Sequence, residues 1–171
     1  GEDEKVILVI GGSLGAKSIN EAVIKNWEKI IADEKIKLFW GTGKDNFEED
    51  TYRMKNFGNS VVKPYFNNVA DIMSASDLVI CRAGASTISE LIQLEKPSIL
   101  IPYDFVGQKE NADVLEYVNG AKIFTNKTAD KAVEEAMTLV KQDEMLEFMK
   151  ENIRKLKKGN AADTIIQEMG L

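Results

Sequence analysis

Two segments of the sequence place small residues and polar groups directly before an expected helix. The first, Gly11-Gly12-Ser13-Leu14-Gly15-Ala16, follows the apolar run Val6–Ile10, and the second, Arg82-Ala83-Gly84-Ala85-Ser86-Thr87-Ile88-Ser89-Glu90, follows Leu78–Cys81. Glycine lets a backbone approach a phosphate closely, and a helix N-terminus offers unpaired N–H groups and the positive end of a dipole. Both segments are therefore candidate anion-binding loops. The alternatives are a tight turn at positive φ for the first and, for the second, a capping box in which Glu90 satisfies a backbone N–H near Thr87.

Two further segments carry groups that could recognise a planar base or a sugar. Tyr65 and Phe66 follow a short apolar run, so an aromatic ring and exposed backbone groups could meet a base; the alternative is ordinary packing at a strand end. Gln108 and Asn111 are three residues apart, so they share one helix face and can reach one ligand. Their alternative is an exposed polar helix start.

Other nucleotide motifs and metal motifs are missing. The glycines at 11, 12 and 15 lack the G-x-G-x-x-G order, and no acidic residue ends the second expected strand, which disfavours a redox dinucleotide domain. Ala16 interrupts a Walker A pattern, and Gly43-Lys44-Asp45 has no Ser or Thr after its lysine. There is no Asp-x-Asp motif, so we expect no metal and no cofactor at the site.

Composition narrows the class of protein. A chain of 171 residues with 44% hydrophobic residues is of the size of one domain. Its net charge of −6 and pI near 4.9 argue against a nucleic-acid partner and against direct insertion into an anionic membrane. The chain has no histidine, which excludes Ser-His-Asp and Cys-His mechanisms within it, and the single Cys81 is expected in the core. We find no membrane-spanning stretch and no signal peptide, so we expect a cytoplasmic chain.

The order of apolar patterns predicts the fold class. Strands are expected at Val6–Ile10, Ile36–Trp40, Val61–Val62, Leu78–Cys81, Ile99–Ile101 and Lys122–Phe124. Helical spacing connects Ile19 with Ile31 on one apolar face, and a helix through Ala112 and Leu115 should end at Gly120 with a C-cap. We therefore expect an α/β domain, a Rossmann-like doubly wound parallel sheet of about six strands. The whole chain is read as a single domain, with residues 1–4 as a linker or tag remnant and about 128–171 as a helical tail. The basic run Lys155–Lys158 is read as a solvated helix end, or as a surface for a partner domain.

Taken together and in order, four segments resemble the C-terminal, donor-binding domain of the MurG family of glycosyltransferases. They are Gly11–Ala16, Tyr65–Met73, Cys81–Glu90 and Gln108–Ala112, within a match from about Val6 to about Phe124. The resemblance implies a GT-B fold, in which two Rossmann-like domains face each other across a cleft. The N-terminal acceptor domain would be absent from this chain.

The resemblance also implies which residues bind UDP-N-acetylglucosamine. Gly12 and Ser13 would face the donor, the Phe66 backbone would meet the uracil, and Ala85, Ser86 and Thr87 would hold the diphosphate. Glu90 would bind the ribose, Gln108 the sugar hydroxyls, and Asn111 would support that loop. The role of Arg82 is left open between contact with the ligand and pairing with a core carboxylate. The chain departs from the family at Ala83, often Ser, and at Gly107, in some members a second Gln.

The implied activity is that of an inverting hexosyltransferase in peptidoglycan synthesis, which moves N-acetylglucosamine from UDP onto lipid I to form lipid II. The catalytic base and the membrane contact would belong to the N-terminal domain, so no catalytic residue is assigned here. The full-length protein would lie peripherally on the cytoplasmic face of the membrane. Isolated, the chain is expected to bind donor without catalysis. The alternatives are a stand-alone donor-binding subunit of a split glycosyltransferase and a binding module for NAD or another nucleotide.

Overall fold

A six-stranded parallel sheet forms the centre of the molecule. The computed structural model describes residues 3–11, 16–54, 56–104 and 107–158. The strands are β1 (Lys5–Ile10), β2 (Ile36–Gly41), β3 (Val61–Lys63), β4 (Leu78–Cys81), β5 (Ser98–Leu100) and β6 (Ala121–Ile123). They lie in the order β3-β2-β1-β4-β5-β6, and every pair is parallel. This confirms the doubly wound fold, with strand bounds within about one residue of those expected.

Helices connect the strands and continue after the last one. They are α1 (Lys17–Lys25), α2 (Trp27–Ala32), α3 (Phe47–Tyr52), α4 (Val69–Ala75), α5 (Ala85–Gln93), α6 (Gln108–Tyr117), the 3₁₀ helix η1 (Asn126–Thr128), α7 (Ala129–Leu139) and α8 (Asp143–Lys157). No helix in the described ranges is long and apolar enough to cross a membrane. Residues 159–171 of the expected helical tail lie outside the described residues.

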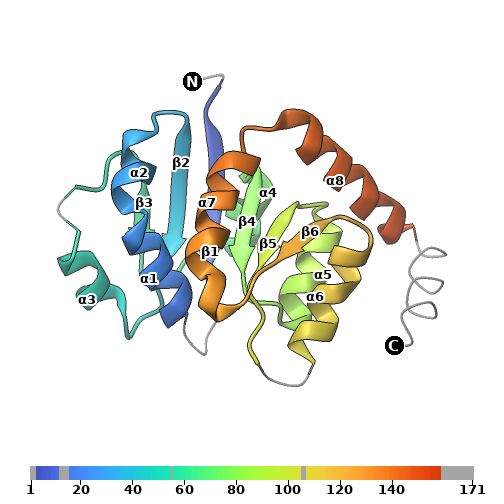
Figure 1. Ribbon diagram of the computed structural model, residues 1–171, viewed down its shortest axis with the longest axis horizontal. Helices are drawn as coiled ribbons and strands as arrows, with labels where there is room; N and C mark the ends of the chain where they lie inside the picture. Colours follow the sequence, from blue (N-terminus) through green and yellow to red (C-terminus); the bar gives the residue numbers. More distant parts are fainter. Residues whose placement is uncertain (1–2, 12–15, 55, 105–106, 159–171) are drawn as a thin grey trace.

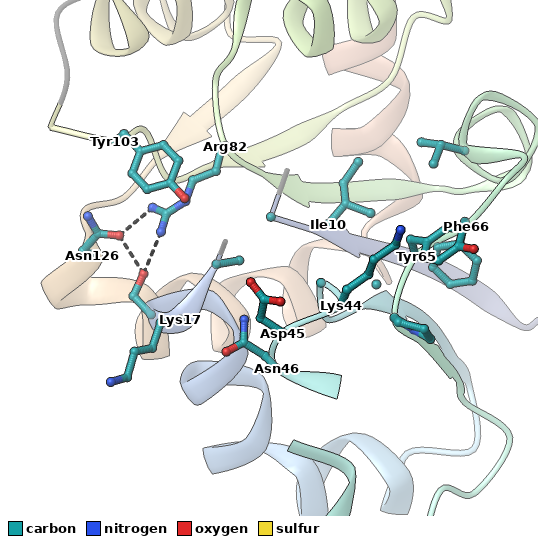
Figure 2. Close-up of a pocket in the computed structure, with 17 residues that line it drawn as sticks. Ile10, Lys17, Lys44, Asp45, Asn46, Tyr65, Phe66, Arg82, Tyr103 and Asn126 are labelled. Atoms are coloured by element: carbon teal, nitrogen blue, oxygen red, sulfur yellow. Dashed lines mark hydrogen bonds between the residues drawn. The ribbon is translucent and has the colours of Figure 1, made fainter. Parts of the chain in front are cut away.

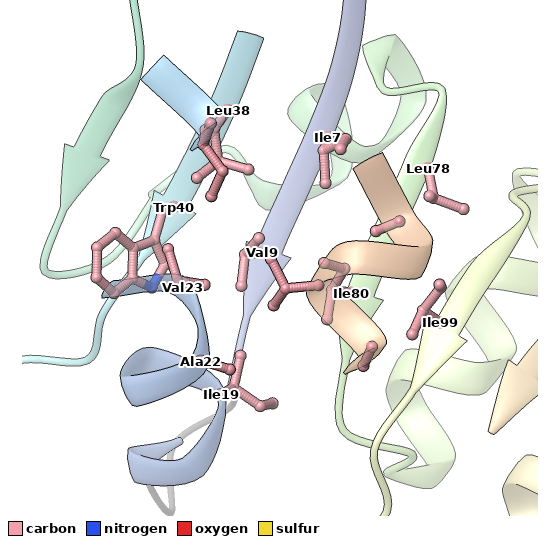
Figure 3. Close-up of a cluster of buried hydrophobic side chains, with 14 of the residues drawn as sticks. Ile7, Val9, Ile19, Ala22, Val23, Leu38, Trp40, Leu78, Ile80 and Ile99 are labelled. Atoms are coloured by element: carbon pink, nitrogen blue, oxygen red, sulfur yellow. The ribbon is translucent and has the colours of Figure 1, made fainter. Parts of the chain in front are cut away.

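Alternate residues of each central strand face opposite sides of the sheet, as a pleated strand requires. Ile7 and Val9 belong to one core, and Leu8 between them belongs to the other. The first core is covered by α1, α2 and α7, whereas α4, α5 and α6 cover the second. Figure 3 shows the first core, with Ile19, Ala22 and Val23 of α1 beside the strands. Burial of both faces explains why the central strands read as continuous apolar runs.

The apolar face from Ile19 to Ile31 is divided between two helices, which corrects the expectation of one continuous helix. Asn26, at φ −96° and ψ 6°, separates α1 from α2. Its side-chain amide donates to the Ala22 carbonyl at 2.9 Å, and its backbone N–H reaches the carbonyls of both Ala22 and Val23 at 3.2 Å. A side chain that competes for backbone acceptors in this way interrupts the helical ladder.

The end of α6 also differs from expectation. The left-handed residue after the helix is Asn119, at φ 59°, and the N–H of Gly120 then donates to the Leu115 carbonyl at 2.8 Å. Gly120 is required for packing instead, because a Cβ at this position would lie 2.6 Å from Cγ1 of Ile153 in α8. The glycine thus lets α8 approach the end of α6 closely.

Helix α8 crosses the amino end of the sheet. Its first half contributes Leu146 and Met149 to the core under α7, and its second half contributes Ile153 and Leu156 to the core under α5. Ion pairs join its ends to the chain near the amino ends of strands, Asp143 to Lys5 and Arg154 to Glu95. In the basic run at the end of α8, Lys157 donates to the Gln93 carbonyl at 3.0 Å, whereas Lys155 and Lys158 are exposed. The carboxyl ends of the strands, at the opposite edge, remain free to carry a ligand site.

Candidate functional site

A pocket of about 940 Å³ opens at the carboxyl edge of the sheet. Its wall takes residues from the segment that follows each of the six strands, from Gly11 after β1 to Asn126 after β6. Figure 2 shows Lys44, Asp45 and Asn46 on one side and Arg82, Tyr103 and Asn126 on another. Because parallel strands bring all these segments to one edge, residues distant in sequence meet here.

Phe66 forms an apolar wall at the β3 side of the pocket. Phe66 is 9% exposed. Its ring packs edge-on against Phe39 at 6.2 Å between centroids and lies beside Gly41, where a Cβ would touch it at 3.5 Å. Ordinary strand-end packing therefore describes this side chain. Among the described residues, nothing hydrogen-bonds to the backbone N–H or C=O of Phe66. A donor and an acceptor thus remain available beside an apolar surface, which suits the edge of a planar base.

Arg82 is buried at the end of β4, and its partners are neutral. Its Nη1 donates to the Ile101 carbonyl at 3.0 Å and to Asn126 Oδ1 at 2.5 Å, and its Nη2 donates to Ser18 Oγ at 3.1 Å. The guanidinium also stacks on the Tyr103 ring, 4.0 Å from its centroid. Burial lowers the pKa of Arg82, while Tyr103 and Asp104 raise it.

No core carboxylate pairs with Arg82 in the described part of the chain, which removes one of the two roles left open by the sequence. A guanidinium stays protonated in proteins. The positive charge in the pocket wall is therefore held by neutral acceptors and the Tyr103 ring, with Asp104 close enough to raise its pKa but not paired with it. This arrangement favours an anion nearby.

Helix α5 begins at Ala85 after Gly84, and no side chain caps it. The first amide of its ladder is that of Ile88, which donates to the Gly84 carbonyl at 2.9 Å, so the N–H groups of Ala85, Ser86 and Thr87 have no acceptor within the helix. The alternative of a capping box at Thr87 and Glu90 is wrong, because Thr87 already lies inside the helix. Glu90 is exposed further along it. Three free donors and a dipole end are the features of an anion site.

The first residues of α6 hold the segment between β4 and α5. Oε1 of Gln108 accepts hydrogen bonds from the backbone N–H groups of Ala83 and Tyr103, both at 3.1 Å, and Nδ2 of Asn111 donates to the Ala83 carbonyl at 3.0 Å. Both side chains are partly buried, so they are not a freely exposed polar helix start. The two accepted bonds fix the Gln108 amide with its NH₂ group directed elsewhere, and among the described residues that group has no partner.

Both positions that depart from the family pattern are constrained in this structure. Gly107 has φ +100°, a conformation in which a glutamine would be strained. Ala83 is fully buried.

The thiol of Cys81 is unsuited to nucleophilic chemistry. Burial raises the pKa of the Cys81 thiol to about 12, so it is neutral near pH 7 and a poor nucleophile. No group of three or more acidic or cysteine side chains within the described ranges could hold a metal ion.

Comparison with known proteins identifies the family. The profile of the glycosyltransferase family 28 C-terminal domain matches residues 6–168. The chain belongs to glycosyltransferase family 28, as its C-terminal domain. A family 28 relative from Fusobacterium nucleatum subsp. nucleatum is 46% identical over 171 residues, which cover 98% of this chain and 48% of the relative. It is named UDP-N-acetylglucosamine–N-acetylmuramyl-(pentapeptide) pyrophosphoryl-undecaprenol N-acetylglucosamine transferase, as is a relative from Desulforamulus reducens that is 33% identical over 96% of this chain and 48% of its own.

A solved structure agrees. The crystal structure of Acinetobacter baumannii MurG matches 98% of this chain and 52% of its own with a TM-score of 0.77 and 26% sequence identity. This family 28 domain therefore spans about half the length of the relatives it matches.

The residues predicted to bind donor are distributed along the same edge of the family 28 domain. Phe66 lines the pocket; Ala85, Ser86, Thr87 and Glu90 lie on α5, and Gln108 and Asn111 on α6, outside the pocket lining. Gly12 and Ser13 lie outside the described residues. Sequence reasoning missed several pocket residues that the structure adds, among them Lys44, Tyr103 and Asn126. The position of Lys44 just after β2 was a usable signal, since segments that follow parallel strands reach this edge.

Proposed function

We propose that this chain is the donor-binding half of an inverting glycosyltransferase that uses UDP-N-acetylglucosamine. The observation that carries the proposal is a row of polar groups at one edge that have no partner among the described residues: the α5 amides, the Phe66 N–H and C=O, and the Gln108 NH₂ group. The names of the family 28 relatives support the donor sugar and the reaction, transfer to lipid I in peptidoglycan synthesis. In the full-length protein, an N-terminal domain supplies the acceptor site, the base and the membrane contact at the cytoplasmic face.

In this proposal each group binds the part of the donor that its chemistry suits. The N–H and C=O of Phe66 pair with the uracil edge, and the carboxylate of Glu90 accepts hydrogen bonds from the ribose diol. The amides of Ala85, Ser86 and Thr87 hold the diphosphate, together with Gly12 and Ser13. Gln108 donates to the sugar hydroxyls, and Asn111 keeps the Ala83 peptide in place.

The contribution to catalysis is stabilisation of the leaving group. As the sugar departs, negative charge grows on the terminal phosphate of UDP. Amides already fixed at the start of a helix stabilise this charge without reorganisation. The nearby Arg82 charge acts in the same direction. No metal ion and no cofactor is assigned a role.

A dinucleotide function is disfavoured by the second strand. β2 ends at Gly41 and is followed by Thr42, where a carboxylate would be needed to hold the ribose of NAD. The pocket end at β2 therefore lacks the group that a redox domain uses.

The test is calorimetric titration of the chain with UDP, UDP-N-acetylglucosamine, UDP-N-acetylgalactosamine and NADH. We expect uridine ligands to bind in the micromolar to millimolar range, about −4 to −8 kcal/mol, with preference for the N-acetylglucosamine donor and no response to NADH. Glu90→Ala should abolish binding, whereas Glu144→Ala, which removes an exposed helix carboxylate at the opposite edge, should not. Binding of NADH with no response to uridine ligands would reject the proposal. Sugar transfer by the chain alone would contradict the assignment of the base to the N-terminal domain.

A further inference from the structure

Lys44 and Tyr65 form a pair on the pocket wall that none of the assigned roles uses. The loop after β2 is joined to the loop after β3 by two backbone hydrogen bonds, from Thr42 N–H to the Lys63 carbonyl at 3.0 Å and from Gly43 N–H to the Pro64 carbonyl at 2.8 Å. Gly43, at φ +87°, turns the chain between them. These bonds place Lys44 opposite Tyr65 (Figure 2).

The ammonium group of Lys44 is held by the ring and by little else. Its Nζ lies 4.7 Å from the centroid of Tyr65, whose side chain is 51% exposed. Among the described residues no carboxylate pairs with Lys44 and no acceptor takes its protons. Lys44 thus presents three N–H donors and a positive charge at the β2 end of the pocket.

The contact of Lys44 with the neighbour of Phe66 decides which part of a nucleotide would reach this pair, if the proposed function holds. The α5 amides proposed for the diphosphate follow β4, whereas Lys44 follows β2 and Tyr65 follows β3, on the far side of β1. Lys44 Nζ lies over the ring of Tyr65, the residue directly before Phe66. The edge of a base that pairs with the Phe66 backbone, which is the edge furthest from the ribose, therefore lies next to the Lys44 ammonium. In uracil that edge carries the carbonyl oxygen O4, and in cytosine it carries an amino group.

The backbone of Phe66 discriminates poorly between these two bases. One N–H and one C=O can pair with uracil through O4 and N3–H, or with cytosine through N3 and the amino group. A group that only donates, such as an ammonium, is different: it bonds to O4 and leaves an amino group facing another donor.

We propose that Lys44, held in place by the ring of Tyr65, is a specificity-determining residue that donates a hydrogen bond to uracil O4 and so selects uridine over cytidine nucleotides. The inference deepens the proposed function and rests on it. Tyr65 is the positioning residue of the pair.

The experiment titrates UDP and CDP into the wild-type chain and into Lys44→Met, Tyr65→Leu and Lys37→Met. Lys44→Met keeps an unbranched apolar stem over Tyr65 and removes the charge. Lys37→Met is the matched control, because Lys37 also lies over an aromatic ring of the sheet, 5.4 Å from the centroid of Phe39, but outside the pocket lining. Thermal unfolding of each variant checks that the fold is retained.

We expect Lys44→Met to weaken UDP about five- to tenfold and CDP less than about twofold, the effect of one charge-assisted hydrogen bond at a partly exposed site. Tyr65→Leu should reduce the selectivity by about two- to threefold, and Lys37→Met should leave it unchanged. Equal weakening of UDP and CDP would mean that Lys44 contacts phosphate and would overturn the inference, as would unchanged UDP binding. If the wild-type chain binds no uridine ligand, the proposed function itself fails, and the inference fails with it.

Discussion

Gln108 offers a direct test of how the site is held together, because its two ends have different tasks. Oε1 satisfies the backbone N–H of Ala83, a fully buried residue, and that of Tyr103, which is partly buried. Gln108→Leu removes both acceptors while keeping a similar volume. Two donors left unsatisfied at about 1 to 1.5 kcal/mol each predict a loss of about 2 to 3 kcal/mol in the free energy of unfolding.

Gln108→Glu separates this structural task from binding. The carboxylate still accepts both backbone bonds, so the free energy of unfolding should stay within about 1 kcal/mol of the wild type. The variant loses the NH₂ donors and brings a negative charge toward the proposed diphosphate. Binding of UDP-N-acetylglucosamine should therefore weaken about tenfold or more, which corresponds to about 1.4 kcal/mol.

Urea unfolding gives the stability of both variants, and calorimetric titration gives their donor affinity. The reasoning would be refuted if Gln108→Leu were within about 0.5 kcal/mol of the wild type, since the Ala83 N–H would then not depend on Gln108. It would also fail if Gln108→Glu bound UDP-N-acetylglucosamine as tightly as the wild type does.

Two further predictions concern the fold. Asp50 is buried with no hydrogen bond to Oδ2, and burial, followed by the nearby Glu21 charge, raises its pKa above the ordinary 3.8. The folded state therefore binds the proton more tightly than the unfolded state does. The free energy of unfolding should fall as pH rises through the window above 3.8. Asp50→Asn should remove this pH dependence and raise the free energy of unfolding at pH 7 by about 1 kcal/mol. Urea unfolding at pH 4 and pH 7 measures both effects, and an unchanged pH profile would show that Asp50 does not cause the dependence. Gly120→Ala should destabilise the domain by about 1 to 3 kcal/mol, because its Cβ would lie 2.6 Å from Ile153; an equally stable variant would show that α8 can shift freely.

The layered fold could be predicted from the sequence because it depends on local patterns. The runs at Val6–Ile10 and Leu78–Cys81 are uninterrupted and apolar, as strands buried on both faces must be. The break at Asn26 was hidden, since the apolar spacing continues through it. Nor could Gly120 be distinguished from an ordinary C-cap glycine, because its neighbour Ile153 is 33 residues further along the chain.

The candidate site was only partly predictable, for a similar reason. The α5 start could be found because glycine, small residues and a helix start stand together in sequence. The partners of Arg82 could not, because Ser18 lies 64 residues before it in the sequence and Asn126 lies 44 residues after it. In the sequence, Lys44 stands out only within Gly43-Lys44-Asp45, which does not complete a Walker A motif. Its contact with Tyr65 depends on the register of β2 and β3, which the sequence does not reveal.

Helix α8 makes the domain unfold as a single cooperative unit. A doubly wound sheet has two separate apolar layers, and each could in principle loosen while the other stays intact. Leu146 and Met149 belong to one layer and Ile153 and Leu156 to the other, so disorder in either layer frees one end of the same rigid helix. Loss of packing on one face is thereby transmitted to the opposite face, and the two layers should melt in one transition.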